Sequence, residues 1–212
     1  MPRIKHCGIT GLDDAHRAVE AGAWALGMIF WPGSERRCAP DVAAGIGREL
    51  RRRVELAGVF VNQPLDDIAA LADTVGLTLV QLHGDEGTAF CAEVRRRTGA
   101  RVIKAARIRS GQELQALQAY RNADFHLVDA HVEGQYGGTG QTVDWELLTR
   151  RYSDVPLILS GGLTSENVAE AIERVQPWGV DVASGTEAAP GVKDPVRLEG
   201  FAEAVRSTEV VA

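Results

Sequence analysis

A histidine and a cysteine stand side by side near the start of the chain, in the segment KHCGIT at residues 5–10. Either side chain can exchange a proton, His6 through its imidazole and Cys7 through its thiol, so both are candidates for acid–base chemistry. Neighbouring residues of a β-strand point to opposite faces, so only one of the two can face a given site. The chemistry of this segment therefore depends on the element that carries it and on where that element ends.

Other polar side chains end or follow later apolar runs. Asp129 closes the run FHLVDA, where a buried carboxylate costs free energy unless it is functional or paired. It is therefore either a general acid or base, or a structural partner of Lys104. In the loop after the second run, Arg36 or Arg37 can clamp a carboxylate, and the alternative is a solvated surface charge. His83 is either a ligand contact or a hydrogen-bonded structural histidine.

Glycine-rich turns follow the last three apolar runs. The residues of interest are Gly138 in YGGTGQTVDW, Gly161 and Gly162 in SGGLTSEN, and Ser184 and Gly185 in ASGTE. Backbone N–H groups in such turns can bind phosphate, helped by a helix N-terminus, although each glycine alone can simply turn the chain. Three such turns in succession favour a ligand that carries a phosphate group.

Composition and charge argue against several kinds of partner. The chain has 212 residues, a formal net charge of −6 and a pI near 5.4, which argue against nucleic acid or a membrane surface as partner. No segment approaches the roughly 20 apolar residues of a membrane span. The three cysteines are far apart and lack metal-binding spacing. We therefore expect a reduced, cytoplasmic protein without a disulfide framework or a metal site.

Short apolar runs alternate with amphipathic stretches along the whole chain. The runs are rich in Val, Ile, Leu and Phe, as strands buried on both faces should be, and no two are close enough for a hairpin. The predicted strands are 4–9, 24–30, 55–61, 77–83, 101–108, 125–130, 156–162 and 179–185. The predicted helices are 12–22, 39–53, 64–76, 85–99, 110–121, 143–152, 164–175 (with Ser165 as N-cap) and 194–207.

This alternation requires parallel strands with helical crossovers, either in a closed (β/α)8 barrel or in an open doubly wound sheet. Eight repeats favour the barrel, and no GxGxxG follows the first strand. The sequence therefore predicts an α/β fold, a single-domain (β/α)8 TIM barrel over residues 1–212, with residues 206–212 as a loose C-terminal tail. Barrel active sites lie at the C-terminal ends of the strands, where Cys7, Asp129 and the glycine-rich turns fall.

Together, these motifs resemble those of the phosphoribosylanthranilate isomerase family of the tryptophan pathway. The matching pieces occur in the family's order over nearly the whole chain. They are KHCGIT, FWPGSERRCAP, GVFVN, VQLHGDE, VIKA, LVDA with GGTGQTVDW, LSGGLTSENV and VDVASGTEAAPGVKD. The resemblance implies a cofactor-free Amadori rearrangement of N-(5-phosphoribosyl)anthranilate to 1-(2-carboxyphenylamino)-1-deoxyribulose 5-phosphate.

The resemblance also implies roles for individual residues. Cys7 falls on the general base, Asp129 on the general acid, and Arg36 on the arginine that binds the anthranilate carboxylate. The remaining expected substrate contacts are His83, Gly138, Gly161, Gly162, Ser184 and Gly185. The chain departs from the family pattern at His6, where an apolar residue is usual, at SER in place of SPR, and at ASGTE in place of SSGVE.

Two other functions compete with this one. The first is another phosphosugar barrel enzyme, such as an epimerase or an indole-forming synthase, which would lack the pairing of Cys7 with Asp129. The second is a phosphate-binding regulatory barrel without catalysis, which the intact set of Cys7, Arg36 and Asp129 disfavours. In the isomerase reading the partner is a small-molecule substrate, the location is the cytoplasm, and the assembly is a monomer or a homodimer.

Strand parity gives a further prediction about the opening segment. If Cys7 faces the barrel mouth, His6 points outward, into the layer between strands and helices. Lys5 then shares the inward parity of Cys7 and can pair with Asp181 on the eighth strand. His6 is accordingly expected to be structural.

Overall fold

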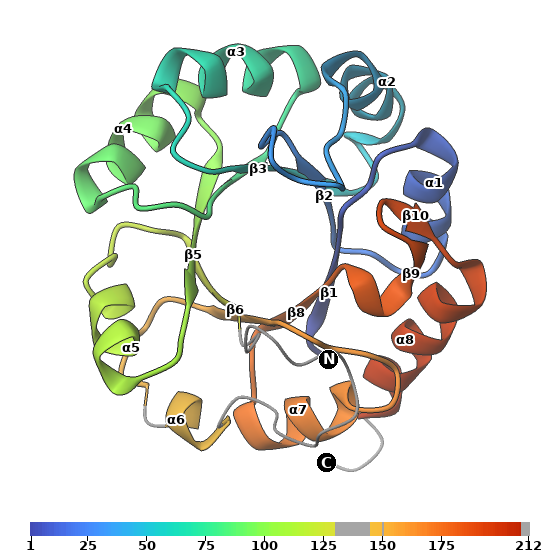
Figure 1. The fold of residues 1–212 in the computed structure, drawn as a ribbon, viewed down its shortest axis with the longest axis vertical. Helices are drawn as coiled ribbons and strands as arrows, with labels where there is room; N and C mark the ends of the chain where they lie inside the picture. The colour runs from blue at the N-terminus through green and yellow to red at the C-terminus, as the bar shows by residue number, and fades with distance from the viewer. Residues whose placement is uncertain (130–144, 150, 209–212) are drawn as a thin grey trace.

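Eight parallel strands close into a barrel in the computed structural model, which describes residues 1–129, 145–149 and 151–208 (Figure 1). Each strand pairs with the next along the chain, and β1 pairs with β8 to close the ring. The strands are β1 Arg3–Cys7, β2 Ala25–Ile29, β3 Glu55–Phe60, β4 Leu79–Leu82, β5 Arg101–Arg107, β6 Phe125–Asp129, β7 Leu157–Ser160 and β8 Gly179–Val182. The (β/α)8 barrel predicted from the sequence is confirmed.

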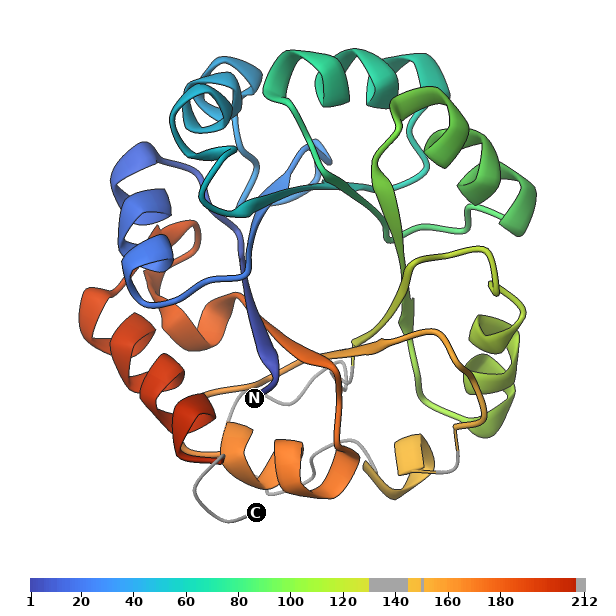
Figure 2. The ribbon, with the colours of Figure 1, turned by 180° about the vertical axis from the view of Figure 1, so that it is seen from behind.

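Helices surround this barrel on its outside, as the views from both ends show (Figure 2). A helical crossover between consecutive strands returns the chain to the starting end of the barrel, so that the next strand lies parallel to the last. They are α1 Leu12–Glu20, α2 Pro40–Leu50, α3 Leu65–Val75, α4 Thr88–Thr98, α5 Gly111–Gln118, α6 Trp145–Thr149, α7 Val168–Val175 and α8 Pro195–Ser207. Every predicted strand and helix therefore has a counterpart, with ends that differ by a few residues.

A short hairpin between β8 and α8 contradicts the expectation that no two strands form one. A single 3₁₀ turn, Ser184–Thr186, leads into β9 Glu187–Ala189, which pairs antiparallel with β10 Val192–Lys193. Contacts distant in sequence hold it, because Thr10 donates a hydrogen bond to the Gly191 carbonyl (2.5 Å) and Asp14 accepts one from the Lys193 N–H (2.8 Å). Strands of two or three residues carry no alternation long enough to be read from sequence.

Helix α7 begins later than predicted. Asn167, and not Ser165, is its N-cap residue. The Asn167 side chain accepts a hydrogen bond from the Thr164 N–H (2.8 Å) and donates one to the Gly162 carbonyl (3.0 Å). This side chain therefore organises the preceding turn, which delays the start of the helix.

Helix α8 continues through Ser207, although the sequence suggested a loose tail from residue 206. Val205 is fully buried, and the Arg206 guanidinium contacts the Glu199 carboxylate (2.5 Å) and the Ala21 carbonyl (3.4 Å). These contacts fix the last turn of α8 to the preceding turns of the same helix and to the end of α1.

The interior of the barrel changes character from the strand starts to the strand ends. Near the starts an apolar cluster fills it, with Trp24, Phe125 and Trp178 in ring contact at centroid distances of 4.7–5.5 Å. The other members are Ala25, Ala57, Leu79, Ile103, Ala105, Leu127 and Ile158. Further along the strands, polar side chains join the interior, among them Lys5, Gln81 and Asp181. Among the described helices, none has the length and apolar character needed to cross a bilayer.

Candidate active site

The predicted site residues come together because all eight strands run the same way, which places their C-terminal ends at one end of the barrel. Cys7 ends β1, Asp129 ends β6, and Ser160 ends β7. His83 directly follows β4, and Arg36 lies in the loop after β2. Gly138, also expected at this end, lies outside the described residues.

Cys7 points into the barrel, beside Lys5 and across from Gly27. Cys7 and Gly27 are partners in the β1–β2 register. A Cβ atom added at Gly27 would lie 2.8 Å from the Cys7 Sγ and 3.0 Å from the Lys5 Nζ. Only a residue without a side chain leaves this space to the thiol and the ammonium. Burial raises the pKa of the Cys7 thiol above its usual value, while the charge of Lys5 opposes that rise.

Lys5 forms the buried ion pair that strand parity predicted. Its Nζ lies 2.6 Å from Asp181 Oδ1, and the other carboxylate oxygen, Oδ2, accepts a hydrogen bond from Ser160 Oγ (3.0 Å). Burial alone would lower the pKa of Lys5, but Asp181 raises it, and the net shift is upward. Lys5 is therefore a charged ammonium inside the barrel.

His6 points the other way, as predicted, into the layer between β1 and the helices. Its ring is fully buried and meets the Phe201 ring of α8 edge-on, at a centroid distance of 6.2 Å. Neither ring nitrogen has a hydrogen-bond partner among the described residues. Burial lowers the pKa of His6 to about 3, so the imidazole is neutral at neutral pH.

Asp129 lies near His83 on the inward face. Asp129 Oδ2 is 3.8 Å from His83 Nε2, and His83 Nδ1 is 3.2 Å from the Gln81 side-chain nitrogen. Burial lowers the pKa of His83, although Asp129 acts in the opposite direction. Lys104, the alternative partner considered for Asp129, instead binds Glu86 (2.9 Å). Asp129 and His83 thus form a polar group on the β4–β6 side of the mouth.

Arg36 is held over the end of β1 by a carboxylate that the sequence analysis missed. Its Nε lies 3.0 and 2.9 Å from the two oxygens of Glu187, and its Nη2 lies 2.8 Å from Glu187 Oε2. Glu187 also contacts the Lys193 Nζ (3.4 Å). This pairing uses one edge of the guanidinium, so the edge formed by Nη1 and Nη2 is the one that can bind another carboxylate.

A glycine makes this arrangement over β1 possible. Gly8 has a φ of +79°, in the left-handed region, and a Cβ there would lie 3.0 Å from both the Arg36 Cδ and the Glu187 Oε1. Glu187 could have been suspected from sequence only because it directly follows the ASGT turn. No local pattern links it to Arg36, which lies 151 positions away.

The two predicted phosphate turns after β7 and β8 touch each other. Gly161 and Gly162 have φ angles of +97° and +63°, which favour glycine. A Cβ at Gly185 would lie only 2.0 Å from the Leu163 carbonyl oxygen, so the turn carrying Ser184 and Gly185 packs directly on the turn after β7. Backbone groups of both turns are thus available at one place in the mouth.

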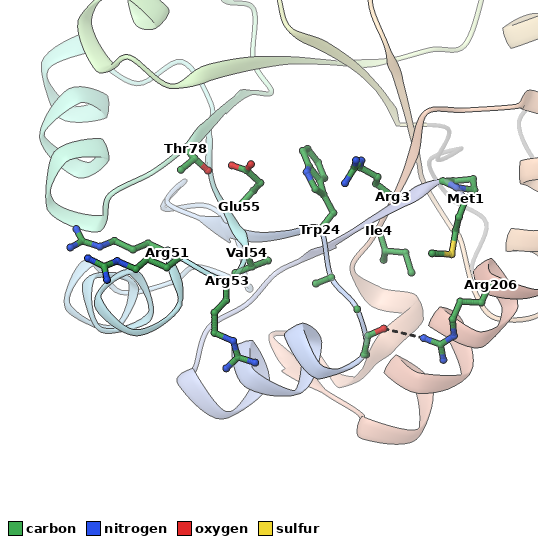
Figure 3. A pocket seen from close by; sticks show the side chains of 15 residues that line it. Met1, Arg3, Ile4, Trp24, Arg51, Arg53, Val54, Glu55, Thr78 and Arg206 are labelled. Atoms are coloured by element: carbon green, nitrogen blue, oxygen red, sulfur yellow. Dashed lines mark hydrogen bonds between the residues drawn. The ribbon is translucent and has the colours of Figure 1, made fainter.

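A cavity of about 830 Å³ lies at the opposite end of the barrel (Figure 3). Arg3, Trp24, Glu55 and Thr78, which line it, precede or begin strands and do not end them. It is therefore separate from the strand-end residues. Among the described residues, no group of His, Cys, Asp or Glu side chains is arranged to hold a metal ion.

Comparison with known proteins points to one family. The model of the family described as N-(5'phosphoribosyl)anthranilate (PRA) isomerase matches residues 4–204. The N-(5'-phosphoribosyl)anthranilate isomerase of Pelobacter propionicus is 46% identical to this chain over 98% of its residues and 97% of the relative.

Solved structures give the same result. The phosphoribosyl anthranilate isomerase of Thermotoga maritima matches with a TM-score of 0.89 and 41% identity, over 98% of this chain and 100% of that one. A structure of the isomerase in complex with reduced 1-(o-carboxyphenylamino)-1-deoxyribulose 5-phosphate matches with a TM-score of 0.86 and 38% identity, again over 98% and 100% of the two chains.

Proposed function

This chain belongs to the N-(5'-phosphoribosyl)anthranilate isomerase family, and from that premise we propose that Cys7 and Asp129 perform its chemistry. The chain is an isomerase of tryptophan biosynthesis, and it converts N-(5'-phosphoribosyl)anthranilate to 1-(2-carboxyphenylamino)-1-deoxyribulose 5-phosphate. The observation that supports the two roles is that a thiol and a carboxylate end two non-adjacent strands, β1 and β6, on the inward face of one barrel.

The rearrangement needs one acid and one base. Asp129 gives a proton to the furanose ring oxygen, and the C1′–O bond breaks as the anthranilate nitrogen forms an iminium. The iminium makes the C2′ proton acidic, and Cys7 removes it as the thiolate. The resulting enolamine then tautomerises to the ketone product, as C1′ gains a proton and the C2′ hydroxyl loses one. Acid and base reach the substrate from different sides of the mouth, so each can act on its own atom.

The ends of the substrate are held by other groups. Arg36 presents the Nη1–Nη2 edge of its guanidinium to the anthranilate carboxylate. Backbone N–H groups of Gly161–Gly162 and Ser184–Gly185 bind the phosphate, with Gly138 assigned to the same task from sequence alone. His83 contacts the substrate from the side of Asp129. These contacts fix the sugar between Cys7 and Asp129.

The partner is a small molecule. We further propose that the chain acts in the cytoplasm, as a monomer or a homodimer and without nucleic acid, which its net charge of −6 supports. Sedimentation at several protein concentrations distinguishes the two assemblies.

A direct assay tests the role of Cys7. Phosphoribosylanthranilate fluoresces through its anthranilate ring, so its consumption can be followed as the fluorescence decays. Cys7→Ser is expected to lose about 10²–10⁴-fold in kcat, because a serine hydroxyl is too weak a base at neutral pH while filling nearly the same space. Substrate should still bind. Retention of more than about a tenth of wild-type kcat would exclude Cys7 as the base.

A further inference from the structure

Lys5 is a buried charge for which the acid–base scheme above has no use. Its side chain is fully buried, and the only carboxylate that the described residues place in ion-pair contact with it is Asp181, at 2.6 Å. An ammonium removed from water costs several kcal/mol, which the contact with a carboxylate offsets only in part. A buried charge at such a position calls for a role beyond packing.

The position of Lys5 relative to Cys7 suggests that role. The two residues are two apart on β1 and share the inward face. Their Sγ and Nζ atoms each lie within 3.0 Å of the point where a Cβ of Gly27 would sit. The thiol and the ammonium therefore share the small space that this glycine leaves open.

The ammonium is held in place from two further strands. Asp181 on β8 binds Lys5 through Oδ1 and Ser160 on β7 through Oδ2, so both of its oxygens have fixed partners. Because β7, β8 and β1 are neighbours in the barrel, this chain of contacts runs across one side of its wall. A lysine anchored in this way cannot swing away from Cys7 without breaking the ion pair.

We propose that Lys5 is a positioning residue for proton transfer at Cys7, where its ammonium stabilises the thiolate that accepts the C2′ proton. This rests on the proposed role of Cys7 as base. In the step, the C2′–H bond breaks and an S–H bond forms, the electron pair of the C–H bond neutralises the iminium, and Lys5 keeps its own proton. Lys5 therefore changes the amount of thiolate and not the identity of the base.

The electrostatics around the thiol agree with this assignment. Burial raises the pKa of Cys7, Lys5 and Lys193 lower it, and Asp181 raises it. Of these two cations, Lys5 has the larger effect on the pKa of Cys7. Lys193 itself donates hydrogen bonds to the Glu187 carboxylate and the Ala183 carbonyl. Without Lys5, the larger of the two charge interactions that oppose the effect of burial on the thiolate is lost.

The chain offers a matched control in Lys104. This lysine is also buried and also paired with a buried carboxylate, Glu86, at 2.9 Å. It faces outward, because its neighbours Ile103 and Ala105 belong to the interior cluster. Its removal therefore breaks a buried ion pair of the same kind without removing a charge beside Cys7.

The test measures the pKa of Cys7 directly, by NMR titration of protein labelled with ¹³C at the cysteine Cβ, with the Cys7 signal assigned from Cys7→Ser. In Lys5→Met we expect this pKa to rise by about 1–3 units, because an opposite charge beside the thiolate is lost. Lys5→Gln, which keeps a hydrogen bond to Asp181, should show the same direction if Lys5→Met folds poorly. Lys104→Gln should move it by less than about half a unit.

Loss of the Lys5 charge should also change the steady-state kinetics. The kcat of Lys5→Gln should fall about tenfold or more while KM changes less than about threefold, since Lys5 acts in the proton transfer and not in binding. A Cys7 pKa that is unchanged in folded Lys5 variants, or moved equally by Lys104→Gln, would overturn the proposal. Should Cys7→Ser keep its activity while Lys5→Gln still shifts the thiol pKa, the role of Cys7 as base fails and the contact itself stands.

Discussion

Lys5 and Lys104 are both buried lysines paired with buried carboxylates, yet they lie on opposite faces of the barrel wall. Two further neighbours of Lys104 are not reactive groups: its Nζ donates a hydrogen bond to the Gly84 carbonyl (2.6 Å) and lies 5.4 Å from the centre of the Tyr120 ring. Lys5 instead lies beside a thiol and faces the site. Burial and ion pairing are therefore alike on the two faces, and the neighbours of each pair indicate which one serves chemistry and which serves stability.

The strongest test of this comparison changes an inward carboxylate. Asp129→Asn is expected to lose about 10²–10⁴-fold in kcat, because an amide cannot deliver the proton to the ring oxygen. Its pH profile of kcat/KM should lose one limb of the bell that the wild-type enzyme is expected to give. Fluorescence kinetics across pH measure both. A profile with both limbs unchanged would contradict the acid role and weaken the link between the inward face and catalysis.

A smaller effect is expected where an inward-reaching group only binds. Arg36→Met should raise KM about tenfold to a hundredfold with little change in kcat, because a charge-assisted contact to the substrate carboxylate is lost. Glu187→Gln should raise KM by less, about threefold to tenfold, since Arg36 remains but loses the carboxylate that orients it. Steady-state kinetics of both variants decide this. A fall in kcat at unchanged KM would place Arg36 in the proton transfers instead.

The smallest effect on activity is expected on the outward face of β1. His6→Leu should keep kcat/KM within about tenfold of wild type, because its ring packs against Phe201 and not in the site. Buried ring nitrogens without partners cost about 1–3 kcal/mol, so the Tm at pH 7 should stay level or rise. A folded His6→Leu protein as inactive as Cys7→Ser would mean that the two faces of β1 were assigned the wrong way round.

The same variant has a pH dependence with a definite sign. The pKa of His6 is about 3 in the folded protein, against an ordinary value of 6.5 that applies to the unfolded chain. Between pH 6.5 and pH 3 the unfolded chain therefore binds a proton at this residue and the folded chain does not. Above pH 6.5 this difference in protonation does not affect stability, and below pH 6.5 it lowers the free energy of unfolding progressively as the pH falls toward 3. The Tm advantage of His6→Leu should therefore grow between pH 7 and pH 4.5, and thermal melts at both pH values measure it.

Local sequence patterns were enough to predict the barrel and half of the network around Cys7. The alternation of runs placed Cys7 and Asp129 at strand ends, and strand parity turned His6 outward. Parity together with the expected closure of the barrel between the first and eighth strands paired Lys5 with Asp181. Parity works because a strand buried on both faces leaves each residue only two directions.

The rest of the site depends on contacts that no local pattern encodes. Arg36 and Glu187 are 151 positions apart, and the hairpin that carries Glu187 has strands of only three and two residues. The ion pair between Lys104 and Glu86 was also missed. Glu86 lies in a loop, and the hydrophobic periodicity of a sequence does not predict the path of a loop. Such contacts follow from the closure of the whole barrel and become visible only in three dimensions.

The distances along the chain between these partners have a consequence for how the enzyme is made on the ribosome. Cys7 is synthesised long before Asp181, Glu187 and Lys193, because these three residues lie far downstream of it along the chain. Until then β1 has no β8 to pair with, Lys5 has no carboxylate, and Arg36 has no support over the mouth. A nascent or truncated chain therefore carries the thiol without the surroundings that make it a base, and activity arrives together with the closing of the ring.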